Sequence, residues 1–114
     1  MKILITGGAG YIGSLLCEYL LKNNHKVTVL DTFMFSNNSL NAYMSNKNFS
    51  VYQEDVRNIT SIRKYIVEND VIVPLACLVG APLCNLKEEE AAQVNFQSIK
   101  KMVDILSKDQ YVIY

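Results

Sequence analysis

Glycines are concentrated near the start of the chain, where the stretch GAGYIG matches the pattern G-x-G-x-x-G and Gly7 stands directly before it. Because glycine has no Cβ atom, the first glycines allow a tight turn and Gly10 lets the backbone approach a pyrophosphate. The last one, Gly13, lets a helix pack closely on a strand. Backbone amides at the start of that helix, around Tyr11 and Ile12, would face the phosphates. The pattern therefore predicts a dinucleotide site.

An acidic residue follows at the distance that such a site requires. Asp31 ends the second strand-like run, 18 residues beyond Gly13 (31 − 13). Its carboxylate could accept hydrogen bonds from the adenosine ribose hydroxyls, and it would repel the 2′-phosphate of NADP. No Arg or Lys that could neutralise such a phosphate follows until Lys47. The sequence therefore predicts NAD as the cofactor, bound at least about tenfold more tightly than NADP.

Strands and helices alternate along the chain and would position these residues. Apolar, β-branched runs predict strands over residues 2–6, 26–30, 49–53 and 70–76, with a fifth beginning at the end of the chain. This alternation indicates a parallel sheet covered on both faces, since parallel strands need crossover helices. The predicted fold class is α/β, a doubly wound parallel sheet of Rossmann type with strand order 3-2-1-4-5. Because the sequence stops at the fifth strand, residues 1–114 are expected to form an incomplete Rossmann domain.

Helices are predicted from apolar periodicity and from their caps. The helix after the glycines should bury one face, made of Ile12, Leu15, Leu16, Tyr19 and Leu20. A second helix should begin with Thr60 as its cap. A long third helix should begin near Glu88 and bury a later stripe, made of Ile99, Met102, Val103 and Leu106. Residues 32–48 are polar and predict a loop with a short helix.

Composition excludes several classes of protein. Half of the 114 residues are hydrophobic, and eleven basic residues balance eleven acidic ones. No basic stripe is present, so nucleic acid is not an expected partner. No apolar run is long enough to span a membrane, and the first strand begins too early to leave room for a signal peptide. Three cysteines without paired spacing predict reduced thiols, no metal site and a cytoplasmic protein.

The chain resembles the NAD-dependent epimerase/dehydratase family, the extended short-chain dehydrogenase/reductases, which act mostly on nucleotide sugars. The stretch TGGAGYIG is similar to the phosphate loop of that family, and Asp31 stands where the family binds ribose. The stretch EDVRN resembles the segment after its third strand, which implies that Asp55 meets the adenine amino group and Val56 the adenine ring. Phe33 and Phe35, just past Asp31, could flank the adenine, or they could be loop aromatics that cover the core.

Two later segments extend the resemblance over the whole chain. The stretch VPLACLVG is similar to the family's H-L-A-A segment, although a proline replaces the histidine, and it implies that Leu75 and Ala76 line the cofactor. The stretch AAQVNFQSIKKMVD resembles the helix that carries a family asparagine at the floor of the active site, here Asn95. The resemblance also implies a nucleotide sugar as a partner and leaves a homodimer open.

No catalytic residue is predicted within this chain. The family uses a Ser or Thr after the fifth strand and a Tyr-x-x-x-Lys on the next helix, and the sequence reaches neither before Tyr114. One Tyr-x-x-x-Lys does occur, at Tyr43 and Lys47, but it follows the second strand, at the adenosine end of the expected site. We interpret it as a coincidence and expect no catalytic turnover from this chain alone.

Three hypotheses for function remain at this point. The chain could be the amino-terminal, NAD-binding portion of a nucleotide-sugar epimerase or dehydratase. It could instead be a stand-alone dinucleotide-binding module or pseudoenzyme, or part of an extended-family reductase with a non-sugar substrate. The chain's ending on the apolar strand YVIY favours the first. Asp31 disfavours the third, because reductases more often prefer NADP.

Overall fold

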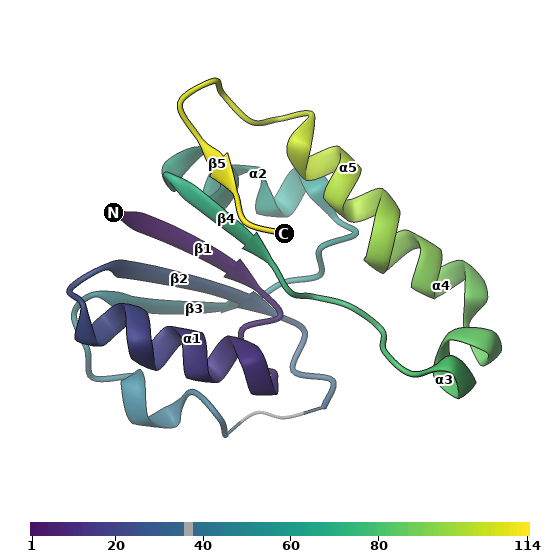
Figure 1. The fold of residues 1–114 in the computed structure, drawn as a ribbon, viewed down its shortest axis with the longest axis horizontal. Helices are drawn as coiled ribbons and strands as arrows, with labels where there is room; N and C mark the ends of the chain where they lie inside the picture. Colours follow the sequence, from purple (N-terminus) through teal and green to yellow (C-terminus); the bar gives the residue numbers. More distant parts are fainter. Residues whose placement is uncertain (36–37) are drawn as a thin grey trace.

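A five-stranded parallel sheet forms the centre of the protein (Figure 1). The computed structural model describes residues 1–35 and 38–114. The strands lie in the order β3-β2-β1-β4-β5, with bounds β1 Lys2–Thr6, β2 Lys26–Asp31, β3 Phe49–Gln53, β4 Val71–Pro74 and β5 Tyr111–Val112. This order and the Rossmann-type fold class confirm the prediction. The fourth strand is shorter than the predicted range of 70–76.

Seven helical segments connect the strands in the described part of the chain. Their bounds are α1 Tyr11–Lys22, η1 Asn41–Tyr43, α2 Ile59–Glu68, α3 Ala81–Leu86, α4 Glu88–Ala92, η2 Gln93–Gln97 and α5 Ser98–Val103. Because α4, the π-helical η2 and α5 follow one another directly, they correspond to the predicted long helix (Figure 1). The short helix η1 lies in the predicted loop 32–48, of which residues 36–37 lie outside the described residues.

Two apolar cores cover the two faces of the sheet. Side chains alternate along β1, so Ile3 and Ile5 join the core under α1 while Leu4 joins the opposite core. Helix α2 contributes Ile62 to that second core, to which α5 also contributes. Both faces of the central strands are therefore buried, which explains their nearly continuous apolar sequence.

The predicted buried face of α1 is wrong in part. Ile12, Leu15 and Tyr19 are 65%, 52% and 65% exposed. Leu20 is buried as predicted and Leu16 packs against the core, but the other residues that α1 buries are Gly13, Cys17 and Leu21. The physical reason is the close approach at Gly13, which fixes the rotation of the helix and turns the positions four, seven and eight residues later toward the sheet.

Two further details of the helices differ from the prediction. Helix α2 begins at Ile59, and its cap is Asn58, whose side chain accepts a hydrogen bond from the backbone N–H of Ser61 at 3.3 Å. Thr60, the predicted cap, already lies inside the helix. On the last helix, Met102 is buried as predicted but Val103 is 49% exposed. Val103 is the last residue of α5, and Ile105, just beyond the helix, packs against the core together with Ile99 and Leu106.

Candidate functional site

A cavity of about 900 Å³ opens at the carboxyl ends of the strands. All of the residues predicted to contact a cofactor line it, namely Gly7, Gly10, Tyr11, Ile12, Gly13, Asp31, Asp55, Val56, Leu75, Ala76 and Asn95. They come from the segments that end or follow β1, β2, β3 and β4, from the first turn of α1 and from η2. Ligands of doubly wound sheets bind in this crevice, and the volume suits a small molecule or a cofactor.

The glycine loop between β1 and α1 requires glycine at two positions. At Gly7, φ is 71°, and a Cβ atom would lie 2.6 Å from the backbone nitrogen of Ala76. At Gly13, a Cβ atom would lie 2.5 Å from the Cα atom of Gly8, inside the loop itself. The loop can therefore pass close to both β4 and α1 only because these side chains are missing.

The amino terminus of α1 presents free backbone amides to the cavity. The first intrahelical bond runs from the N–H of Ser14 to the carbonyl oxygen of Gly10 at 3.0 Å, so the N–H groups of Tyr11, Ile12 and Gly13 precede it. Gly10 is the cap of the helix and has no side chain to accept from these amides. Together with the positive end of the helix dipole, the three N–H groups make this end of the cavity suitable for an anion.

The carboxylate of Asp31 connects the end of β2 to the glycine loop. One oxygen, Oδ2, accepts a hydrogen bond from the N–H of Ala9 at 2.9 Å, and Oδ1 accepts one from the N–H of Phe33 at 2.8 Å. Phe33 has a φ of 59°, an uncommon conformation for a residue other than glycine. The carboxylate is thus held in one orientation at the cavity wall, with acceptor capacity left for a hydroxyl donor.

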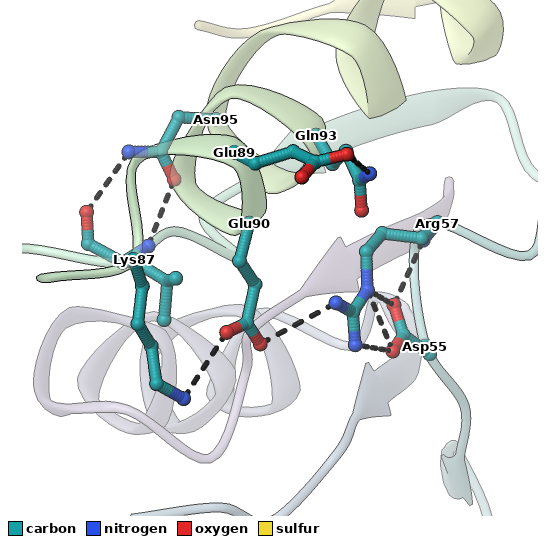
Figure 2. Close-up of polar contacts among 8 residues, drawn as sticks. Asp55, Arg57, Lys87, Glu89, Glu90, Gln93 and Asn95 are labelled. Carbon is teal, nitrogen blue, oxygen red and sulfur yellow. Dashed lines mark hydrogen bonds and ion pairs between the residues drawn. The ribbon is translucent and has the colours of Figure 1, made fainter. Parts of the chain in front are cut away.

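A second carboxylate lies beyond Asp31, after β3. Asp55 accepts hydrogen bonds from the backbone N–H of Arg57 at 2.9 Å and from its guanidinium Nε at 3.0 Å (Figure 2). The hydrogen bond from the Arg57 side chain is the main cause that lowers the pKa of the Asp55 carboxyl. Between these residues, Val56 is 5% exposed and belongs to the second core. The cavity wall here therefore combines an ionised acceptor with an apolar surface.

The opposite wall follows β4. The N–H of Leu75 donates to the backbone oxygen of Thr6 at 2.9 Å, and that of Ala76 approaches the Thr6 hydroxyl at 3.4 Å. Asn95, on η2, accepts from the N–H of Leu78 at 2.8 Å and donates to its carbonyl at 2.9 Å. Asn95 therefore holds the loop after β4 in place and also lines the cavity. Its position is compatible with both a structural role and a role in ligand binding.

Of the two aromatic residues that could flank the adenine, Phe35 lines the cavity and is 73% exposed, whereas Phe33 packs against the core under α1. Arg57 and Glu90 also line the cavity, and neither was predicted from the sequence. They come from distant segments, and nothing in the local sequence indicates that they meet.

The residues of the Tyr-x-x-x-Lys coincidence lie outside this cavity. Tyr43 ends the short helix η1 and packs edge to face on Phe49, with the ring centres 5.9 Å apart. Lys47 lies beyond the end of that helix, at a separate groove. Over residues 1–35 and 38–114, no cluster of three or more metal-binding side chains occurs. In the same ranges, no helix has the length and apolar character needed to cross a membrane.

Comparison with known protein families identifies the family of this chain. The sequence model of the NAD dependent epimerase/dehydratase family matches residues 3–113. The chain belongs to this family. The recognition made from the glycine loop and the strand ends is therefore confirmed, and the cofactor of this family is NAD.

Curated relatives of this chain include nucleotide-sugar enzymes. This chain is 29% identical over 107 residues to a UDP-N-acetyl-alpha-D-glucosaminuronate decarboxylase of Bacillus cytotoxicus, and the match covers 94% of this chain and 33% of that protein. It is 32% identical over 110 residues to UDP-glucuronic acid decarboxylase 1 of Danio rerio, covering 90% of this chain and 25% of that protein. The chain thus spans about a third or less of the length of these relatives.

Solved structures of other proteins share the fold of this chain. Pal from Bacillus thuringiensis superimposes with a TM-score of 0.86 at 23% identity, over 92% of this chain and 35% of that one. The Bordetella bronchiseptica enzyme WbmG, solved in complex with NAD, gives a TM-score of 0.79 at 27% identity, over 92% of this chain and 33% of that one. The fold that these two structures share with this chain therefore covers nearly all of its sheet and helices.

Proposed function

We propose that this chain binds NAD in the cavity and is the cofactor-binding part of an enzyme that acts on a nucleotide sugar. The observation that carries the proposal is the convergence of free helix amides, an oriented Asp31 and the glycine loop on one cavity of about 900 Å³. The names of its relatives, UDP-sugar decarboxylases and epimerases, support the substrate class.

The order of strand ends suggests how NAD would lie. The pyrophosphate would sit at the amides of Tyr11, Ile12 and Gly13, with Gly7 and Gly10 leaving it room. The adenosine ribose would reach Asp31 at the end of β2, and the adenine would reach Asp55 and Val56 after β3, since these strands lie in that order across the sheet. The nicotinamide half would then extend the other way, toward Leu75, Ala76 and Asn95.

Bound NAD would supply the redox chemistry, by accepting a hydride from the sugar and returning it after the ketone intermediate has reacted. The residues of this chain would bind and orient the cofactor. Residues 1–114 would thus form the NAD-binding Rossmann part of the enzyme and would give no turnover alone, because the acid–base residues that the resemblance implies are not among them.

Location and assembly are part of the same proposal. All three cysteines, Cys17, Cys77 and Cys84, are free thiols. Free thiols are typical of a reducing compartment, which supports a cytoplasmic protein. We also propose that the complete enzyme forms a homodimer, on the resemblance to its family.

A substitution at Gly10 tests NAD binding without disturbing the fold. Its φ of −72° suits any residue, and a Cβ atom would meet only the carbonyl oxygen of Gly7 at 3.3 Å. Gly10→Asp should cap α1 well but place a carboxylate against the pyrophosphate. We expect NAD affinity, measured by isothermal titration calorimetry, to fall by about 100-fold or more while the melting temperature is maintained.

The matched control adds the same charge to the first turn of another helix. Thr60 is exposed in α2 and lies outside the cavity. Thr60→Asp should leave NAD affinity unchanged. Unchanged affinity in Gly10→Asp, or no saturable NAD binding by the unmodified chain, would contradict the proposed function.

A further inference from the structure

A chain of ion pairs, drawn in Figure 2, includes three residues that line one side of the cavity, Asp55, Arg57 and Glu90. Arg57 binds the carboxylate of Asp55 through its Nε and Nη2 atoms. Its remaining terminal nitrogen, Nη1, lies 3.3 Å from Oε1 of Glu90 on α4. The other oxygen of Glu90 lies 3.1 Å from Nζ of Lys87. Arg57 is therefore shared between the segment after β3 and the helix after β4.

The ion pair between Arg57 and Glu90 is one of two polar contacts that link the helix α4–η2 to other walls of the cavity. Glu90 and Asn95 stand five residues apart on the continuous helix α4–η2, and both line the cavity. Asn95 ties the helix to Leu78 in the loop after β4, and Glu90 ties it to Arg57 on the other side. The helix is thus anchored by polar contacts to two walls that belong to different strand ends.

The carboxylate of Asp55 is oriented but not saturated. Three donor groups of Arg57, one of them backbone, make four contacts with its two oxygens, because the single Nε hydrogen is shared between both oxygens. Only three hydrogens are therefore directed at a carboxylate that offers about four acceptor positions, which leaves room for one more donor inside the cavity. Arginine suits this task because its planar fork fixes both oxygens at once, which lysine cannot do.

We propose that Arg57 is a positioning residue that, braced by Glu90, aims the Asp55 carboxylate at the exocyclic amino group of the adenine and so makes the site selective for that base. The proposal rests on the proposed function, in which the adenosine half extends from Asp31 toward β3. The ion pairs are partly exposed, and such pairs contribute little to folding stability. Their effect here is to hold the Asp55 carboxylate in one orientation.

The test compares NAD with nicotinamide hypoxanthine dinucleotide, which has a carbonyl oxygen in place of the amino group. The protein should bind NAD about tenfold or more tightly than the hypoxanthine analogue, because that oxygen would face a carboxylate. In Arg57→Met, which keeps the apolar stem of the side chain, Asp55 can turn away. We expect the NAD affinity to fall about tenfold and the preference between the two dinucleotides to approach unity.

Two matched controls separate positioning from general effects. Arg63 is exposed on α2 and lies outside the cavity, so Arg63→Met should retain the preference for NAD. Glu90→Gln should reduce the preference part-way, whereas Glu89→Gln, which changes an exposed neighbour paired with Gln93, should not. Arg57→Lys should restore only part of the preference, because it restores the charge without the fork.

The outcomes distinguish this inference from the proposed function. If Arg57→Met weakens both dinucleotides equally, or leaves the preference intact, Arg57 does not position Asp55 and the inference is wrong while NAD binding stands. If Glu90→Gln leaves the preference for NAD over the hypoxanthine analogue unchanged, Glu90 does not hold Arg57 in position, and that part of the inference is wrong. If the unmodified protein binds neither dinucleotide, the proposed function is overturned, and this inference with it.

Discussion

Single residues at the cavity are restricted by atoms that lie far away in the sequence. Gly7 combines a positive φ with a backbone contact from Ala76, and Asp31 holds the loop through Ala9. Both would be read from sequence alone as ligand-binding residues. The structure adds that each also holds the glycine loop against the sheet, so that the shape of the site and the stability of the loop depend on the same atoms.

The first prediction at this scale concerns Gly7. An alanine there would suffer both the strain of a φ of 71° and a Cβ contact of 2.6 Å with backbone that cannot move easily. Gly80→Ala provides the control, since Gly80 has a φ of 93° but nothing within 4 Å of a Cβ atom. We expect Gly80→Ala to lower the free energy of unfolding in urea by about 1–2 kcal/mol. Gly7→Ala should cost about 1–3 kcal/mol more, and equal losses would contradict the close contact.

The second prediction concerns the titration of Asp55. The hydrogen bond from Arg57 lowers the pKa of this carboxyl in the folded protein. Its contribution to stability is therefore present above the unfolded-state pKa of about 3.9 and is lost as the pH falls through the lower folded-state value. In Arg57→Met, the pKa of Asp55 should rise, as followed by NMR of its side-chain carboxyl carbon. The same pKa in both proteins would show that Arg57 does not hold the carboxylate in solution.

At the scale of elements, the helices are positioned by their first turns. Helix α1 presents uncapped amides because Gly10 has no side chain, whereas α2 is closed by the side chain of Asn58. The two helices therefore differ in the first turn, as the proposed function requires: the amides of α1 would bind an anion, whereas α2 only has to be stable. Local helix geometry also positions a side chain at the π-helical segment η2. Asn95 lies in this segment, where it contacts Leu78 and lines the cavity.

The cap of α2 gives a prediction at this scale. Asn58→Ala removes the acceptor of the Ser61 N–H and should lower the free energy of unfolding by about 1 kcal/mol. Thr60→Ala, two residues later on an exposed position, should have no cost, because alanine has the higher helix propensity. Chemical unfolding of both variants distinguishes them. A larger loss of unfolding free energy in Thr60→Ala than in Asn58→Ala would indicate that Thr60 is the cap, as the sequence pattern predicted.

Viewed as a whole molecule, the fold and the wall of the cavity were predictable because both follow from local patterns. Parallel strands place their carboxyl ends together, so Gly7, Asp31, Asp55 and Leu75 had to meet once the strand order was known. The rotation of α1 was not predictable from periodicity, because both of its faces carry apolar residues and a single glycine contact decides between them. The pairing of Arg57 with Glu90 joins positions 33 residues apart and leaves no local signal.

The proposed function requires that the whole cavity is an NAD site and that Asp31 makes it selective for NAD over NADP. The most direct measurement is calorimetric titration of the chain with NAD and with NADP, repeated for Asp31→Asn and for Asp104→Asn, an exposed aspartate away from the cavity. We expect the unmodified chain and Asp104→Asn to bind NAD at least about tenfold more tightly than NADP, and Asp31→Asn to show a smaller ratio of the two affinities. Equal affinity for the two dinucleotides in the unmodified chain, or binding of neither, would contradict it.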